Sequence, residues 1–309
     1  LFFTNNMDVV VVGSCNIDLI SYVPRLPKAG ETLHGHKFAI GFGGKGANQC
    51  VVASRLGTTT AMVAKVNFIV FCSKRSHDLV FTDHVSVTKE ASSGVAPIAV
   101  NDDGQNAIVI VSGANLKLSE EDLNKAENII KSSKVMVCQL EVRPEITLAA
   151  LRMAKKHGVT SILNPAPSQP SLDPEMFQTC DIFCPNETET EILTGLPVSS
   201  VDDAKTATKA LLDRGCKMVI ITLGSQGCVL ASKDKPEAVH ILARSVTPVD
   251  TTGAGDAFVG ALASYLAKYP DLGMEETIRR SCEIATISVQ APGTQTSYPW
   301  KKDLPSELF

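Results

Sequence analysis

A glycine-rich turn at residues 249–258, Val-Asp-Thr-Thr-Gly-Ala-Gly-Asp-Ala-Phe, combines residue types that can bind and move a phosphoryl group. Gly253 and Gly255 let backbone N–H groups converge at the start of an apolar helix, where the helix dipole also favours an anion. Asp256 follows directly and is placed to face that anion as a general base. Asp256 could instead only cap the helix, and the turn alone does not decide between the two roles.

A second glycine-rich segment, residues 41–49, reads Gly-Phe-Gly-Gly-Lys-Gly-Ala-Asn-Gln and leads into a helical stretch. It matches the dinucleotide fingerprint G-x-G-x-x-G, but no Asp or Glu occurs between Gly46 and Asp78 to bind a ribose hydroxyl. It is not a Walker A loop, because Gly46 stands where Ser or Thr must follow the lysine. We therefore expect the segment to bring its backbone, Lys45 and Asn48 close to a small polyol.

The elements that must position these turns are predicted to form a mainly parallel α/β sheet. Residues 7–13 are a continuous apolar run typical of a buried central strand, and strands alternate with helices from residue 135 onward. Ligands of such sheets collect beyond the carboxyl ends of the strands. Polar residues recur at those positions: Asn16, Asp18, Glu141, Asn164, Asn186, Glu189 and Thr222. Each could be ordinary turn chemistry, but their repetition favours one binding edge.

Two extended segments interrupt this alternation, at about residues 20–41 and 95–112. Strands that interrupt a series of strand–helix units usually belong to another sheet. We therefore predict one α/β domain at residues 7–309 that carries a small β lid formed from these two segments.

The composition indicates a globular protein, since 44% of the 309 residues are hydrophobic and 20% are charged. The net charge is −4, so the chain lacks the excess of positive charge typical of proteins that bind nucleic acids, and we expect no nucleic acid as partner. No apolar run approaches the ~18 residues of a membrane span, so we expect no membrane as partner either. The nine cysteines include no C-x-x-C pair, which argues against structural zinc. Scattered thiols predict a reducing, cytoplasmic location. The nucleus is a candidate additional location.

Residues 43–48 and 250–256 together resemble the two signatures of the phosphofructokinase-B-type carbohydrate kinases, in that family's order. The resemblance extends from residue 9 to residue 309, apart from one segment. It implies a Rossmann-like, mainly parallel sheet flanked by helices, with a small β-sheet lid. Within the family the resemblance is to animal enzymes, and it implies ATP-dependent phosphorylation of D-ribose at the 5-hydroxyl to give ribose 5-phosphate and ADP. A catalytically impaired isoform that binds sugar or nucleotide, or another carbohydrate or nucleoside kinase of the family, is the alternative.

The resemblance also implies roles for individual residues. Asp256 would take the proton of the hydroxyl, and the amides of Gly253, Ala254 and Gly255 would stabilise charge on the transferred phosphoryl group. The positions that match sugar ligands, besides Asp256, are Asn16, Ile17, Asp18, Gly44, Lys45, Gly46, Ala47, Asn48 and Glu141. The positions that match nucleotide ligands are Asn186, Thr222, Leu223, Gly224, Ser225, Gln226, Gly227, Gly255 and Cys282.

Two cations and a dimer are further implications of the resemblance. Mg²⁺ would be held indirectly, near Asn186 and Glu189. An activating K⁺ would have as ligands Asp250, Thr252, Ser288, Ala291, Gly293 and Ser297. A homodimer formed through the lid strands is the expected assembly, because exposed edge strands need cover.

The sequence departs from the family's pattern at two places. Cys282 stands where the family has Asn or His near the adenine. Residues 67–90 lack the family's Gly-x-Asp-x-Phe-Gly start and amphipathic helix, and the apolar run at 68–72 is more typical of a strand. Because a missing helix would expose apolar surface of the sheet, we expect this chain to have low stability.

Overall fold

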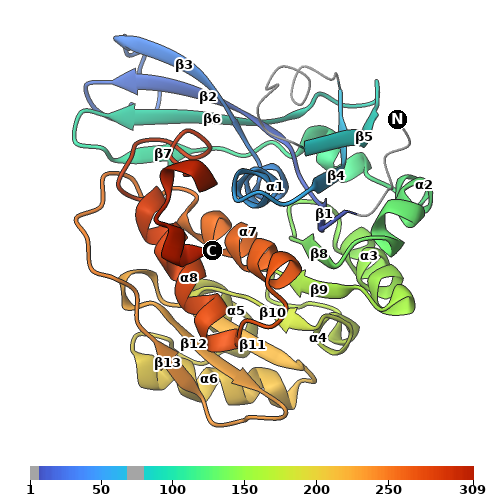
Figure 1. Ribbon diagram of the computed structural model, residues 1–309. Helices are drawn as coiled ribbons and strands as arrows, with labels where there is room; N and C mark the ends of the chain where they lie inside the picture. Colours follow the sequence, from blue (N-terminus) through green and yellow to red (C-terminus); the bar gives the residue numbers. More distant parts are fainter. Residues whose placement is uncertain (1–6, 68–79) are drawn as a thin grey trace.

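The computed structural model describes residues 7–67 and 80–309 and contains two β-sheets (Figure 1). The strands of the nine-stranded sheet, in spatial order, are β13 (Val239–Ile241), β12 (Cys228–Ser232), β11 (Met218–Thr222), β10 (Ile182–Phe183), β9 (Thr160–Leu163), β8 (Val135–Cys138), β1 (Val9–Val12), β4 (Thr60–Val66) and β5 (Val80–Val87). Strand β12 pairs antiparallel with β11 and β13, and the other neighbouring strands are parallel. The predicted mainly parallel α/β sheet is confirmed.

Strand β1 lies between β4 and β8 and is buried on both faces. Val10 and Val12 contact one hydrophobic core, whereas Val9 and Val11 contact the other. This division follows from the strand geometry, in which successive side chains point to opposite faces of the sheet. A strand covered on both faces needs apolar residues at every position, which accounts for the unbroken run of valines.

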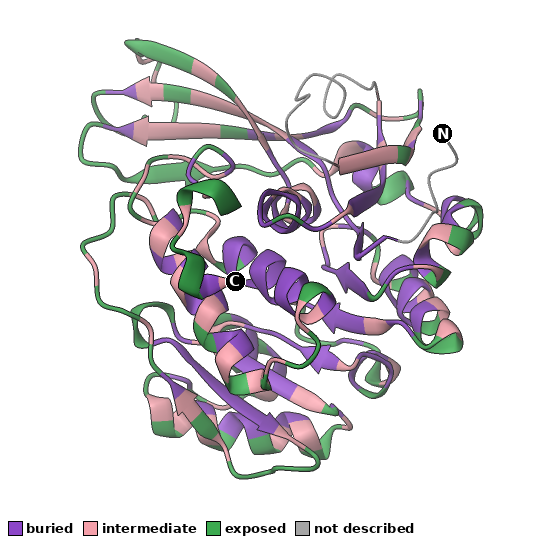
Figure 2. Ribbon diagram, viewed as in Figure 1, coloured by how far each residue is buried: buried purple, intermediate pink, exposed green. Residues whose placement is uncertain are grey.

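Helices cover both faces of the large sheet. The helices that contribute to the first core are α2 (Glu120–Lys131), α3 (Pro144–His157), α4 (Pro174–Thr179), α5 (Glu187–Thr194) and α6 (Val201–Asp213). Those that contribute to the second core are α1 (Lys45–Arg55), α7 (Ala254–Lys268) and α8 (Met274–Ser288). Figure 2 shows α7 buried along almost its whole length, as the apolar sequence after the glycine-rich turn predicts. All helices of residues 7–67 and 80–309 are too short or too polar to cross a bilayer.

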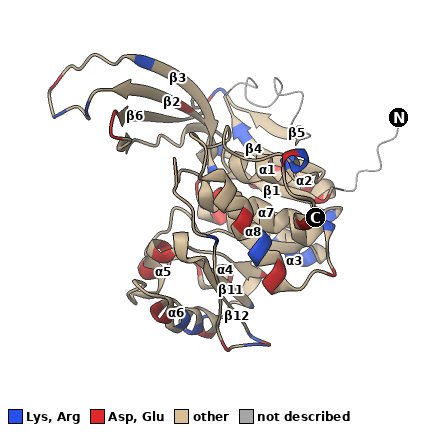
Figure 3. Cartoon of the chain, turned by 60° about the vertical axis from the view of Figure 1, so that its left-hand side comes forward, with Lys and Arg blue, Asp and Glu red and all other residues tan. Residues whose placement is uncertain are grey.

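The second sheet has four strands and projects from the helical layers (Figures 1 and 3). Its strands, in spatial order, are β3 (Lys37–Gly43), β2 (Asn16–Val23), β6 (Gly94–Asn101) and β7 (Asn106–Ile108). Strand β2 follows β1 after only three residues, so Asn16 and Asp18 lie on a strand of this sheet and not in a turn. The sequence indicated an extended segment only from about residue 20, because Asn16 and Asp18 make the start of this strand polar. A role of the small sheet as a lid remains a prediction.

Several local predictions can be compared with the structure. Gly158 ends α3 in the left-handed conformation with φ 69°, as predicted for the residue between that helix and β9. The antiparallel strands β12 and β13 and the helix α2 were not anticipated. The strand predicted at residues 68–72 lies outside the described residues. Beyond them, β5 forms the edge of the large sheet and runs parallel to β4.

Helices α1 and α7 pack closely against each other at Gly260. A Cβ atom on Gly260 would lie 2.6 Å from the backbone oxygen of Gln49 and 2.7 Å from the Cβ of Val52. Asp256 is four residues earlier in α7 and therefore lies on the same face of the helix. The absence of a side chain at Gly260 thus lets α1 come within reach of Asp256.

We predict that Gly260→Ala lowers the free energy of unfolding, because the added methyl group must push α1 away from α7. Overpacking of this kind costs about 1–3 kcal/mol, against which alanine recovers up to about 1 kcal/mol of helix propensity. Urea titration of the wild type and the variant measures the difference. Gly273→Ala is the matched control, because a Cβ there meets no atom within 4 Å. Equal stability of Gly260→Ala and the wild type would contradict the prediction.

Candidate active site

A cavity of about 170 Å³ lies where the carboxyl ends of the strands meet the start of α7. The residues that line it are Lys45, Asn164, Ala166, Cys184, Asn186, Glu189, Thr222, Thr251, Gly253, Ala254, Gly255, Asp256 and Val259. Many residues singled out in the sequence therefore meet at one place, although they come from distant parts of the chain. Asn164 had been indicated as a polar residue at a strand end, whereas the sequence did not single out Ala166, Cys184, Thr251 or Val259 for the site.

The N-terminus of α7 forms one wall of the cavity. Gly253 is the N-cap and has φ 78°, a left-handed conformation that favours glycine. A Cβ at this position would lie 2.5 Å from both Thr294 Cγ2 and Tyr298 Oη, and the Tyr298 hydroxyl donates to the Gly253 carbonyl over 3.2 Å. The first turn of a helix has N–H groups without intrahelical acceptors, and here that turn lines the cavity. This wall can therefore bind an anion.

Asp256 lies in that first turn and is only 6% exposed. Its Oδ2 accepts a hydrogen bond from Asn48 Nδ2, and its Oδ1 accepts one from Gln49 Nε2, each over 2.9 Å. The N-cap position belongs to Gly253 and has no side-chain hydrogen bond, so Asp256 does not cap the helix. Its carboxylate is instead fixed by α1 at the edge of the cavity.

Lys45 brings a positive charge to a cavity surrounded by carboxylates. Burial alone would lower the pKa of Lys45, but the attraction of Asp256, Glu141 and Glu189 outweighs it and raises the pKa. The ammonium group therefore remains charged and can attract an anionic ligand. The backbone N–H of Lys45 also donates to Glu141 Oε2 over 2.9 Å, which ties the glycine-rich segment to the end of β8.

Asn186 and Glu189 form a capping box at the start of α5. Asn186 Oδ1 accepts from the N–H of Glu189 over 2.8 Å, and Glu189 Oε2 accepts from the N–H of Asn186 over 2.9 Å. Burial raises the pKa of Glu189, although the N–H of Asn186 and the charge of Lys45 oppose this shift. Within residues 7–67 and 80–309, no three Asp, Glu, His or Cys side chains form a metal cage. Carboxylate and amide oxygens are of the ligand type that Mg²⁺ prefers, and this ion keeps several of its water ligands.

Asn16 and Asp18 lie at the start of β2, beside the glycine-rich segment. Asn16 Oδ1 accepts from Asn115 Nδ2 over 2.7 Å. A Cβ at Gly43 would lie 2.5 Å from Asp18 Oδ2, so glycine on β3 leaves the space that the carboxylate occupies. Burial and the negative charge of Glu141 raise the pKa of Asp18 from its ordinary 3.8 to about 6.

The predicted nucleotide loop at residues 222–227 connects β11 to β12. Thr222 forms a β-bridge with Asn186 and lines the cavity, whereas the 3₁₀ turn Gly224–Gln226 is exposed. Gly227 has φ 87°, and a Cβ there would lie 2.0 Å from the Ile241 carbonyl.

Other residues predicted to bind nucleotide or sugar lie in α8, in β2 and at the start of α1. Cys282 is buried in α8 with its Sγ 4.0 Å from Cys228 Sγ, and it is not among the residues that line the cavity. Gly44, the N-cap of α1, has φ 88°. Ile17 lies in β2, and Gly46 and Ala47 lie in the first turn of α1.

The residues predicted to bind potassium lie in two segments that the structure brings together. Asp250 Oδ1 accepts from the N–H of Thr252 and Asp250 Oδ2 from the N–H of Gly293, each over 2.9 Å. Burial would raise the pKa of Asp250, but these donors outweigh it and lower the pKa, so the carboxylate is charged. Ser288 and Ala291 belong to the end of α8 and the turn after it, where the Ser288 carbonyl accepts from the N–H of Ala291, and Ser297 lies in a later turn.

Two residues that contact the site indirectly were missed by reasoning from the sequence. Gln49 donates to Asp256, and Gln139 donates to Gln49. Both side chains are completely buried. The available signal was an uncharged amide within an otherwise apolar buried stretch, at 138–140 for Gln139 and on the inner face of the helix for Gln49.

We predict that Asp18→Asn stabilises the protein at neutral pH. Since the pKa of Asp18 is raised to about 6 in the folded state, folding binds a proton between pH 3.8 and 6. The cost of the buried charge is therefore fully present above pH 6 and disappears below pH 3.8. The variant should melt a few degrees above the wild type at pH 7.5, and the difference should shrink toward pH 4. Thermal melts across this range measure it, with exposed Asp234→Asn as control. A difference that grows toward acid pH would contradict the assignment.

The chain is similar to known proteins over most of its length. A family model described as pfkB family carbohydrate kinase matches residues 6–301. The chain is 55% identical over 307 residues to the ribokinase of Mus musculus, which covers 97% of this chain and 94% of the mouse protein. It is 42% identical over 297 residues to the deoxyribokinase of Salmonella typhi, covering 95% of this chain and 96% of that protein.

Solved structures give the same result. The Arabidopsis thaliana ribokinase, complexed with ribose and ATP, superposes with a TM-score of 0.86 at 30% identity and covers 96% of this chain and 97% of its own. The ribokinase of Thermotoga maritima superposes with a TM-score of 0.85 at 33% identity, covering 96% of this chain and 97% of its own. With a matching family model, sequence relatives and folds, this chain belongs to the pfkB family of carbohydrate kinases.

Proposed function

We propose that this kinase transfers the γ-phosphoryl group of ATP to the 5-hydroxyl of D-ribose. The observation that carries the proposal is the convergence of Asp256, Lys45 and the N-terminus of α7 on one cavity. The substrate pair is supported by the 55% identity to mouse ribokinase and by the likeness to the Arabidopsis ribokinase structure with ribose and ATP. The identity to the Salmonella deoxyribokinase makes 2-deoxyribose the second candidate sugar.

In this mechanism Asp256 accepts the proton of the sugar hydroxyl while the hydroxyl oxygen attacks the γ-phosphorus. The bond from the γ-phosphorus to the bridging oxygen breaks, and ADP leaves with the electron pair. The amides of the first turn of α7 and the charge of Lys45 would stabilise the transferred group, since they line the cavity before the reaction starts.

Sugar recognition would come from the small sheet and the start of α1. Carboxylate oxygens accept from sugar hydroxyls and amide groups donate to them. Asp18 and Glu141 supply such acceptors, and Asn16 and Asn48 supply amides. The backbone of Gly44 and Lys45 lies beside them at the start of α1.

Two cations complete the proposal. Asn186 and Glu189 would hold Mg²⁺ through water, and the ion would neutralise charge on the nucleotide phosphates. The segments that contain Asp250 and Gly293 would hold K⁺ beside the turn that leads into α7, with the charged Asp250 as the strongest ligand.

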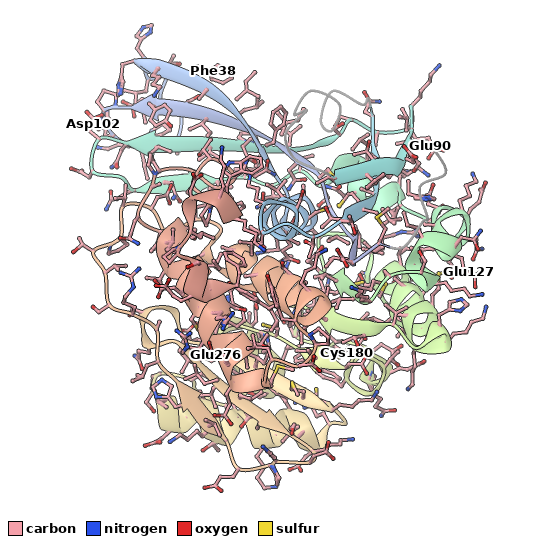
Figure 4. The ribbon with its side chains drawn as sticks, in the orientation of Figure 1. Phe38, Glu90, Asp102, Glu127, Cys180 and Glu276 are labelled. Atoms are coloured by element: carbon pink, nitrogen blue, oxygen red, sulfur yellow. The ribbon has the colours of Figure 1, made fainter. Side chains whose placement is uncertain are left out.

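We further propose a homodimer formed through the small sheet. Phe38 lies on β3 at the outer side of this sheet (Figure 4) and is 59% exposed, and Ile40 on the same strand is 62% exposed. Val109 and Ile110, just after β7, are similarly exposed. Exposed apolar side chains on a sheet edge favour cover by a second copy.

We predict that Asp256→Asn removes the general base and lowers kcat for ribose phosphorylation by about 10²–10⁴-fold. Asparagine retains the shape of the side chain but cannot take the proton. The assay uses ATP, Mg²⁺ and K⁺ with ribose, 2-deoxyribose, fructose and adenosine as acceptors. Binding of ribose, measured by calorimetry, shows whether the variant still forms the site. A wild-type protein that folds and binds ribose but turns over none of the acceptors would instead indicate an impaired isoform.

We also predict that turnover depends on K⁺. Replacing KCl by NaCl at equal ionic strength should lower wild-type kcat by about fivefold or more, the range of coupling between linked sites. Asp250→Ala should have low activity in both salts, because it removes the charged ligand. A variant that keeps the full K⁺ response would contradict the placement of the ion at Asp250.

A further inference from the structure

A chain of buried side-chain amides leads to Asp256 from the side that faces the protein interior. We propose that Gln49, oriented by Gln139, is a positioning residue that holds the Asp256 carboxylate at the angle needed to accept the sugar proton. This inference rests on the proposed function, and it assigns a role to residues that lie outside the cavity lining.

The chain consists of three hydrogen bonds. Gln139 Nε2 donates to Gln49 Oε1 over 2.5 Å. Gln49 Nε2 donates to Asp256 Oδ1 over 2.9 Å and to Asn164 Oδ1 over 3.1 Å. Asn48 holds the other carboxylate oxygen, so two consecutive residues of α1 grip the two oxygens of Asp256. Rotation of the carboxylate about its Cβ–Cγ bond would break one bond or the other.

The direction of the chain follows from the chemistry of the groups. An ionised carboxylate only accepts hydrogen bonds, so Gln49 must turn its NH₂ group toward Asp256. Its Oε1 then faces Gln139, which must donate. The orientation of the Asn164 amide is fixed as well. Its Nδ2 donates to the Cys184 carbonyl over 2.9 Å, so its Oδ1 is left to accept from Gln49.

Gln139 donates to Gln49 in an orientation that is unfavourable for its own side-chain oxygen. Its Oε1 is buried without a hydrogen-bond partner in the described structure. A Cβ at Gly13 would lie 2.0 Å from that oxygen, so only glycine at this position leaves room for the side chain. A buried polar atom without a partner destabilises the fold by about 1–3 kcal/mol. Because the Gln139 amide keeps this orientation in spite of the cost, the orientation indicates that Gln49 Oε1 requires a hydrogen-bond donor.

Within the described residues, Gln49 reaches the cavity only through the side chains of Asp256 and Asn164, and of these only Asp256 is proposed to react. The Gln49 side chain is completely buried and is not part of the cavity lining, so it does not touch a ligand there. Asn48 differs, because it lies at a position that matches a sugar ligand. Loss of Gln49 should therefore change the rate of the chemical step more than the binding of either substrate.

The first variant is Gln49→Met, which retains the length of the side chain and removes its donors. We expect kcat to fall by about 10- to 100-fold, the effect of one hydrogen bond to a charged group. The KM values for ribose and ATP should stay within about twofold of the wild type. The matched control is Gln178→Met on the exposed side of α4, which should retain wild-type kcat.

The second variant tests the orientation by Gln139. Gln139→Met should lower kcat less than Gln49→Met does, because Gln49 can still donate part of the time. The double variant should equal Gln49→Met alone, since Gln139 works only through Gln49. Additive effects of the two substitutions on kcat would overturn this arrangement, because two residues with separate structural roles would lower kcat independently.

The outcomes separate this inference from the proposed function. If the wild-type protein does not turn over ribose, both the proposed function and the positioning role of Gln49 are overturned. Wild-type turnover with unchanged kcat in Gln49→Met, or with a raised KM at unchanged kcat, overturns only the positioning role. Thermal melts accompany each assay, and if Gln49→Met does not fold, the same comparison of kcat and KM in Gln139→Met decides.

Discussion

The contact between α1 and α7 determines where the carboxylate of Asp256, the proposed general base, lies. Gly260 allows the two helices to approach, and Asn48 and Gln49 then reach both oxygens of Asp256. Asn48 and Gln49 are more than 200 positions from Asp256 in the chain. The site therefore exists only when α1 and α7 have packed together on the large sheet. The helix contact is therefore a requirement of the proposed chemistry as well as of the fold.

Much of the fold could be predicted from the sequence because strong local patterns specify it. The valine run of β1 and the alternation after residue 135 require a parallel sheet buried on both faces. Strand β2 was predicted only from about residue 20, since its start carries Asn16 and Asp18, and β12 and β13 were not predicted. Such strands are specified by their neighbours in the sheet and not by their own residues.

The site was predicted to a smaller extent than the fold. The two glycine-rich segments indicated Lys45 and Asp256, because glycine at helix starts followed by charged groups is a local pattern. Gln49 and Gln139 carry no such pattern, and their importance comes from partners distant in the sequence. The raised pKa of Asp18 likewise depends on burial and on Glu141, neither of which is visible in the residues around it.

The short connection from β1 to β2 has a consequence for binding. Asn16 and Asp18 belong to the projecting small sheet, whereas Asp256 belongs to a helix packed on the large sheet. Any rotation of the small sheet about this connection would change the distance between the two groups of ligands. A sugar that touches both would oppose the rotation and join the sheets, so part of its affinity would appear as increased order of the protein. The ligand would then act as an additional contact between the two sheets.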